Sequence, residues 1–212
     1  MKTTVKRPAR QRAVYLDDGR NPALNFINTR KRNRKGDYDD LLGSYLQFLE
    51  WCERCGVIDW DTCLVLEAEQ HCYEREAENA LEYALNLRLA LRVLFDNLLD
   101  GAPPDEFFLQ YFNRVMREVQ SHLEYQQGGH GLSQFWVNVH EELQSPIWFI
   151  AEQAAQLMGS ANLRRLKRCS ACGSLFLDMS QSQTRTWCNP NTCGALRKSA
   201  QYYNRKNAKK AA

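Results

Sequence analysis

The chain has 212 residues, of which 44% are hydrophobic and 25% are charged, and its formal net charge is +3, values that are ordinary for a soluble globular protein. Charged residues interrupt every apolar run before it reaches the roughly 18 residues that a membrane-spanning helix needs, so we expect no membrane partner. The basic segment 1–14 is not followed by an apolar stretch of the kind found in secretory signals, so we expect a cytoplasmic protein with reduced thiols.

The body of the chain is predicted to be mainly helical. Apolar residues at three- and four-residue spacing predict amphipathic helices that are separated by caps, glycines and prolines. Residues 30–37 are interpreted as a charged loop, and two β-prone runs around QQGGHG in 119–139 predict a hairpin. Pro104 and Pro146 are expected in first helical turns, the latter after Ser145 as N-cap. The predicted helices begin near 21 and cover 38–55, about 59–73, 78–100, 105–119 and 145–158.

Four of the eight cysteines fall within this helical body. Three of them are expected on helix faces beside leucines and aromatic residues, where free cysteine packs as a small hydrophobe. A C-x2-C pair inside a helix also lacks the tight turn that points two thiolates at one ion. We interpret this group as core packing, with metal or redox chemistry as the alternative. Its members are Cys52, Cys55, Cys63 and Cys72.

The other four cysteines, Cys169, Cys172, Cys188 and Cys193, follow the spacing C-x2-C-x15-C-x4-C. Small residues lie between the first two, and Gly173 permits a knuckle turn with positive φ. We expect a short strand over 174–178, a returning strand over 185–187, and a helix that begins after the second pair. Two thiolate pairs predict one tetrahedral, structural zinc ion, and the segment contains no histidine or glutamate for a catalytic one.

Charge is concentrated at the two ends of the chain. Residues 1–35 carry a net charge of +9 and residues 161–212 carry +10, whereas residues 36–160 carry −16. If 194–210 is a helix, its cations form one stripe that contains an aromatic residue, which is the pattern of nucleic-acid binding; a solvated helix is the alternative. The predicted nucleic-acid contacts are Arg185, Arg197, Lys198, Tyr202, Arg205 and Lys206, with Lys209 on the same stripe.

The cysteine-rich segment resembles the CGNR zinc finger, and LNFINTR at 24–30 resembles a segment of the ABATE domain that precedes this finger in its family. Ala195 and Leu196 stand where the family has Asn and Arg, and Asn25 stands where it has an acid. The resemblance implies a helical ABATE-like domain at 1–160 and a finger at 161–212. The matching finger residues are Cys169, Cys172, Phe176, Asp178, Ser180, Arg185, Trp187, Cys188, Cys193, Gly194 and Lys198.

The fold class that we expect is therefore mainly α, with a helical N-terminal domain that includes a small β-hairpin, followed by a treble-clef-like zinc finger. The resemblance implies a stress-related transcriptional regulator that binds DNA and whose helical body senses a small-molecule effector or forms a homodimer. An RNA-binding or protein-interaction zinc module is the alternative. The four histidines are scattered, and no glycine-rich phosphate loop or hydrolase motif occurs, so we expect no catalysis.

Overall fold

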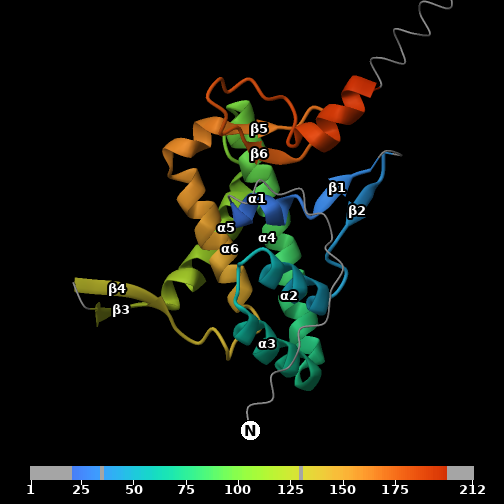
Figure 1. The fold of residues 1–212 in the computed structure, drawn as a ribbon. Helices are drawn as coiled ribbons and strands as arrows, with labels where there is room; N and C mark the ends of the chain where they lie inside the picture. Colours follow the sequence, from blue (N-terminus) through green and yellow to red (C-terminus); the bar gives the residue numbers. More distant parts are fainter. Residues whose placement is uncertain (1–20, 34–35, 129–130, 200–212) are drawn as a thin grey trace, which may run out of the picture.

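The structure is a computed structural model that describes residues 21–33, 36–128 and 131–199 (Figure 1). These residues are mainly helical, as the sequence predicts, and they also form three two-stranded antiparallel sheets. None of the described helices is both long and apolar enough to cross a bilayer. The α-helices are α1 Pro22–Ile27, α2 Tyr45–Arg54, α3 Trp60–Cys72, α4 Glu74–Asp100, α5 Glu106–Ser121 and α6 Ser145–Met158. The strands are β1 Arg30–Arg32, β2 Tyr38–Asp40, β3 Leu123–Gly128, β4 Gly131–Trp136, β5 Leu166–Arg168 and β6 Leu175–Leu177.

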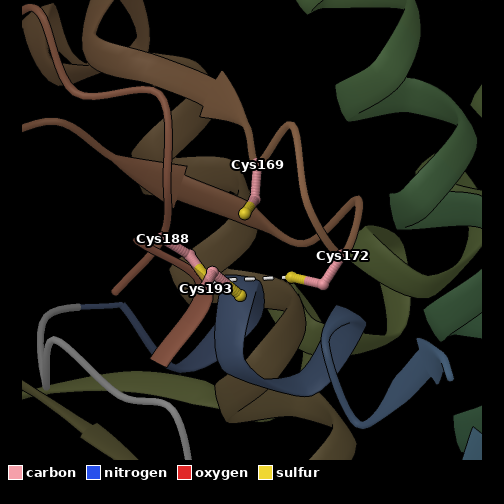
Figure 2. Close-up of side chains that lie close together, drawn as sticks. All are labelled: Cys169, Cys172, Cys188 and Cys193. Carbon is pink, nitrogen blue, oxygen red and sulfur yellow. Dashed lines mark hydrogen bonds between the residues drawn. The ribbon is translucent and has the colours of Figure 1, made fainter. Parts of the chain in front are cut away.

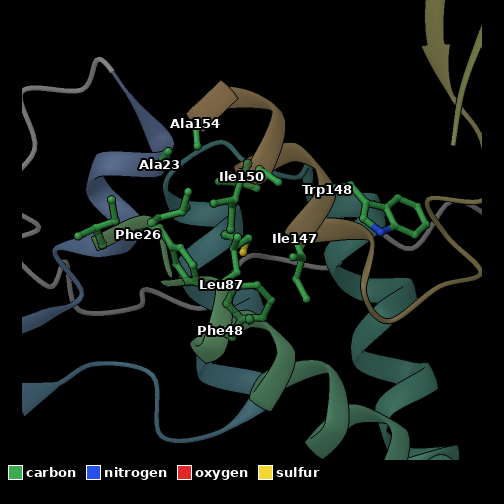
Figure 3. Packing of buried hydrophobic residues seen from close by; sticks show 14 of the residues in the cluster. Ala23, Phe26, Phe48, Leu87, Ile147, Trp148, Ile150 and Ala154 are labelled. Atoms are coloured by element: carbon green, nitrogen blue, oxygen red, sulfur yellow. The ribbon is translucent and has the colours of Figure 1, made fainter. Parts of the chain in front are cut away.

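The helical body is built around α6, which contacts α1, α4 and α5. Figure 3 shows how Phe26, Phe48 and Leu87 meet Ile147 and Ile150 of α6 in the centre of this core. All five side chains are fully buried. Burying a side chain of this size stabilises the folded state by about 1.5–3 kcal/mol, so the body has an apolar core that needs no metal.

Capping residues explain where several helices begin and end. The side chain of Asp59 accepts a hydrogen bond from the Thr62 N–H at the start of α3, close to where the sequence predicts that a helix begins. Gly101 ends α4 in the left-handed conformation, with a φ of 65°. The prediction that Pro104 lies in the first turn of α5 is wrong, because Asp105 is the N-cap and the helix begins at Glu106, two residues after Pro104. Ser145 is already helical, so it is not the N-cap of α6.

The segment from Arg30 to Asp40 differs most from the prediction. It was expected to be a charged loop running into a helix, but β1 and β2 form an antiparallel ladder in which Arg30 lies opposite Asp40. The next helix begins only at Tyr45, because the side chain of Ser44 accepts a hydrogen bond from the Gln47 N–H and fixes the start there. In Figure 1 this hairpin projects from the body on the side of α4, whereas the predicted hairpin β3–β4 projects at the opposite end.

The short strand predicted over 174–178 is present as β6, but its partner is not the expected returning strand at 185–187. β6 pairs with β5, which precedes the first cysteine, in the register Leu166 to Leu177. Every residue of β6 is buried. Leu175 and Leu177 belong to the core of the helical body, whereas Phe176 belongs to a second cluster around the cysteines. One strand therefore connects two hydrophobic clusters, because successive side chains point to opposite faces.

Candidate metal centre

The first two cysteines lie on either end of a tight turn that follows β5. The Cys169 N–H donates to the Ser174 carbonyl at 2.8 Å, and the Gly173 N–H donates to the Cys169 carbonyl at 2.9 Å. Gly173 has a φ of 74°, a conformation that side chains with a Cβ rarely adopt. The turn therefore forms the knuckle that the sequence predicts, and it places both sulfur atoms on one side of the backbone.

The second pair is held by a turn at Pro190–Gly194. The Asn189 side chain accepts hydrogen bonds from two backbone N–H groups of this turn. Gly194 is packed against the ring of Trp187, since a Cβ at this glycine would meet the indole at 3.3 Å. The chain is helical directly afterwards, over residues 195–199. Cys193 therefore lies where a helix begins, as predicted, but burial and the neighbouring cysteines raise the pKa of its thiol to about 11.

The four cysteines converge from these two turns (Figure 2). Their sulfur atoms all lie within 4.8 Å of one another. Tetrahedral zinc with Zn–S bonds of about 2.3 Å requires sulfur atoms about 3.8 Å apart. The Sγ of Cys188 lies 3.7 Å from the Sγ of Cys172 and 3.7 Å from that of Cys193. The donor set and its spacing therefore fit zinc.

The charges of the four thiols also favour a bound divalent cation such as zinc. Hydrogen bonding to Cys169 and Cys172 raises the pKa of the Cys188 thiol, and burial raises it further. Several sulfurs this close cannot all ionise without a positive charge among them. A divalent ion supplies that charge and deprotonates coordinating thiols. All four positions are protein thiolates, which is the composition of a closed, structural zinc site.

Comparison with known families agrees with this geometry. A family described as "ABATE: Putative stress-induced transcription regulator" matches residues 20–161, and the CGNR zinc finger matches residues 165–206. The chain belongs to the ABATE family. No curated protein matches the chain. The resemblance inferred from the sequence is confirmed, and Cys169, Cys172, Cys188 and Cys193 of the CGNR finger hold one structural zinc ion.

Asp178 of the CGNR motif organises the loop between the two cysteine pairs. Its fully buried carboxylate accepts hydrogen bonds from the Lys167 ammonium at 2.8 Å, the Ser180 hydroxyl at 2.6 Å and the Arg185 N–H at 2.9 Å. Burial alone would raise the pKa of Asp178, but these hydrogen bonds outweigh it and hold the pKa well below its usual value. The aspartate therefore remains charged and fixes the loop that leads to Cys188.

The cysteines of the ABATE domain behave differently. Cys52 and Cys63 are buried in the helical core, and burial raises the pKa of the Cys52 thiol. Cys55 is half-buried beside them, but Cys72 is exposed, so core packing is wrong for that residue. Within the described residues the C-terminal quartet is the only group of three or more potential ligands close enough to hold a metal ion.

Polar contacts dock the finger onto the ABATE domain, and the sequence pattern gave no signal for them. The amide of Asn28 donates to the Leu175 carbonyl at 2.7 Å and accepts from the Leu175 N–H at 3.0 Å, so it pairs with β6 as a strand would. Arg92 donates to the Gly173 carbonyl at 3.0 Å, and Arg168 pairs with Asp96 at 2.8 Å. The burial of Asn28, which only the structure reveals, identifies this contact.

The basic residues predicted to contact nucleic acid have different surroundings. The guanidinium of Arg185 lies over the Phe176 ring, 5.3 Å from its centroid, so this side chain also shapes the finger. Arg197 is exposed and donates to the Ser170 carbonyl at 3.0 Å, and Lys198 is exposed. Their contacts with nucleic acid stay a prediction. The remaining predicted contacts, Tyr202, Arg205 and Lys206, lie outside the described residues.

Ala195 and Leu196, which stand where the CGNR pattern has Asn and Arg, are both exposed. Neither side chain is needed to hold the cysteines or to fill the cluster around them. The substitutions therefore change the surface of the finger and leave its scaffold intact.

Proposed function

We propose that this protein is a DNA-binding transcription regulator in which the zinc finger carries the DNA contacts. The family description supports a regulator. The observation that carries the proposal is the exposed basic start of the helix that follows Cys193, where Arg197 and Lys198 lie four and five residues beyond a zinc ligand. Zinc would fix the direction of this helix, and it takes part in no catalytic step.

The ion pairs of the finger support this assignment. Among its described residues, Lys167 pairs with Asp178, and Arg168 pairs with Asp96 and Asp100 of α4. The other cations form no ion pair with any carboxylate in the described part of the chain, so no acidic side chain there competes with phosphates for their charge. They are Arg164, Arg165, Arg185, Arg197 and Lys198. Residues 36–160 carry a net charge of −16, which disfavours contact between this part of the body and DNA.

The proposal places the protein in the cytoplasm and gives the ABATE domain a stress-related signal to receive. All eight cysteines are free, which is typical of a reducing compartment. A signal received in the body can reach the finger, because the two units share Leu166, Leu175 and Leu177 in one core.

Salt dependence of binding tests the DNA contacts. The zinc-loaded full chain should bind duplex DNA with a log–log salt slope of about −0.9 for each phosphate contacted. Replacing both residues in Arg197→Gln/Lys198→Gln should make the slope shallower by about 2 units. The matched control is Arg75→Gln, at the far end of α4 from the finger, which should leave the slope unchanged. A slope near zero in the wild-type chain would contradict the proposal.

Competition separates DNA from RNA. Unlabelled duplex DNA should displace a bound DNA probe from the full chain at lower concentration than structured RNA of the same length. If RNA is the better competitor, the finger is an RNA-binding module. If the double variant Arg197→Gln/Lys198→Gln binds DNA as well as the wild-type chain does, the finger does not supply the DNA contacts. That result would instead favour a protein-interaction role for the finger.

A further inference from the structure

A hollow of about 670 Å³ lies between the ABATE domain and the first zinc knuckle. Its walls are the β1–β2 hairpin, the middle of α4 and residues 168–174 of the finger. Pockets for small molecules usually have volumes of about 300–1,000 Å³ and occur preferentially between domains. The size and the position of the hollow are therefore those of a ligand site, and it contains neither of the exposed basic residues proposed to meet DNA.

The hairpin wall presents two arginines that form no salt bridge within the described residues, although Asp40 lies opposite Arg30 in the β1–β2 ladder and its carboxylate feels the Arg30 charge. Arg30 and Arg32 are two residues apart in β1, so both side chains lie on the same face of the strand, and both line the hollow. Among the residues that the structure describes, neither forms an ion pair. The other arginines of the hollow are neutralised, since Arg88 binds Asp40 and both Arg92 and Arg168 bind Asp96.

The two arginines are also held in place. The guanidinium of Arg30 lies over the Tyr38 ring, 4.8 Å from its centroid, which leaves the N–H groups at its edge free to point at a ligand. Arg32 donates from Nε to the Gly36 carbonyl at 3.2 Å, so its two terminal nitrogens remain available. Planar guanidinium groups bind carboxylates and phosphates with paired hydrogen bonds.

The α4 wall carries apolar side chains between its paired charged residues. Leu85 and Leu89 of α4 line the hollow, together with the buried Ile27. Leu89 is 45% exposed although it faces this recess. A ligand that matches both walls has an anionic head for the arginines and an apolar body for the leucines. The phosphates of a nucleic acid could bind the two arginines of the hairpin. The sugar-phosphate backbone has no apolar group, however, that would fill the space beside Leu85 and Leu89.

We propose that this hollow binds a small organic oxyanion, with its carboxylate or phosphate on Arg30 and Arg32 and its apolar part against Leu85 and Leu89. Such a ligand would touch the body and residues 170–174 of the knuckle together, so its binding would stabilise the docked arrangement of the two units. The site deepens the proposed function by giving the regulator an effector, but it can be tested without DNA.

Calorimetric titration of the zinc-loaded full chain with four probes tests the site. Benzoate and phenyl phosphate carry the two possible heads on one apolar body, inorganic phosphate has a head alone, and benzyl alcohol has the body alone. We expect saturable binding of benzoate or phenyl phosphate near one equivalent, and their relative affinities identify the head. Failure of both to bind, or equal affinity for inorganic phosphate or for benzyl alcohol, would overturn the proposal.

Variants locate the binding. Arg30→Gln/Arg32→Gln should weaken the better probe by about tenfold or more, since it removes charge-assisted hydrogen bonds. Leu89→Asp should also weaken it, by placing a negative charge on the opposite wall. The matched control is Lys31→Gln, which removes a charge from the same strand but from its other face, and affinity should stay within about twofold. Unchanged zinc content and circular dichroism establish that each variant is folded.

Three results would overturn the site. The first is an unchanged affinity for the probe in the double arginine variant. The second is a loss of affinity in Lys31→Gln as large as that in the double variant. The third is that the wild-type chain binds none of the probes, while the double arginine variant loses DNA binding. The last result would assign Arg30 and Arg32 to nucleic acid. Because the titrations contain no DNA, failure of this site and failure of the proposed DNA contacts are distinguished.

Discussion

The helical body and the finger are stabilised in different ways. The body buries large apolar side chains from five helices around α6, whereas the buried members of the cluster around the finger are only Cys169, Phe176 and Cys193. Two of these three are zinc ligands. A unit of this size usually needs a metal or disulfides, because its surface is large relative to its core. The difference indicates that apolar burial stabilises the body, whereas the finger depends on metal coordination together with the leucines that it adds to the body core.

Loss of zinc gives the largest expected effect. Cys188→Ser removes one ligand, and zinc binding supplies about 10–16 kcal/mol in comparable fingers. We expect zinc to be absent from the purified variant and the amide signals of residues 169–199 to lose dispersion in NMR spectra, while those of α4 and α6 remain dispersed. Metal analysis and a heteronuclear NMR spectrum measure the two parts separately.

Cys52→Ser is the matched control, because it changes a cysteine of the other group. It should retain one equivalent of zinc and lose about 1–3 kcal/mol of unfolding free energy, since it places a hydroxyl in an apolar core. A zinc content that falls equally in both variants would contradict the assignment of the two groups.

Truncation in the body core gives the next largest effect. Phe48 is fully buried, and Phe48→Ala should lower the free energy of unfolding by about 3–5 kcal/mol, measured by urea denaturation. Phe107→Ala is the control, since Phe107 is 72% exposed. Zinc content should stay at one equivalent in both variants. If the folded Phe48→Ala variant loses zinc, zinc binding by the finger depends on the packing of the body core as well as on the four cysteines.

Much of this architecture was predictable because it depends on local patterns. Apolar periodicity identified the long helices, and Asp59 and Gly101 fixed ends of α3 and α4. The zinc ligands were predictable for the same reason, since the knuckle requires only small residues, Gly173 and the two cysteines that flank the turn. Both kinds of signal lie within a few residues of the feature that they specify.

The features that could not be predicted depend on residues far apart in the chain. Segment 30–40 is polar enough to resemble a loop, and it becomes a hairpin where Arg88 of α4 binds both Asp40 and Thr29. Likewise, the partner of β6 was misassigned because strand pairing near Cys169 depends on the core beneath Leu166 and Leu177. The hollow beside the knuckle exists only once both units are docked.

Removing the link between the two units should have a smaller effect than either core change. Asn28→Ala leaves the buried N–H and carbonyl of Leu175 without a partner, and we expect a loss of about 2 kcal/mol in unfolding free energy. Hydrogen exchange should rise most at β6. Asn113→Ala, on an exposed face of α5, should change stability by less than about 0.5 kcal/mol. Unchanged exchange at β6 would mean that the docking does not depend on this amide.

The smallest effect concerns pH and the ion pair that holds the hairpin to the body. Burial raises the pKa of Asp40, but the hydrogen bonds from Arg88 and the Leu42 N–H outweigh it and lower the pKa below its usual value. A lowered folded-state pKa means that this stabilisation is complete above the unfolded pKa of about 3.9 and is lost as the pH falls through the folded value.

Asp40→Asn should therefore be less stable than the wild type at pH 7, by about 1 kcal/mol, because the carboxylate is 36% exposed and water screens the pair. The difference should shrink as the pH falls below about 4. Zinc release in acid lowers the stability of both proteins alike, so the difference in unfolding free energy isolates the ion pair. A difference that does not change with pH would mean that Asp40 acts through hydrogen bonding that Asn preserves in part, and that charge contributes nothing to the position of the hairpin.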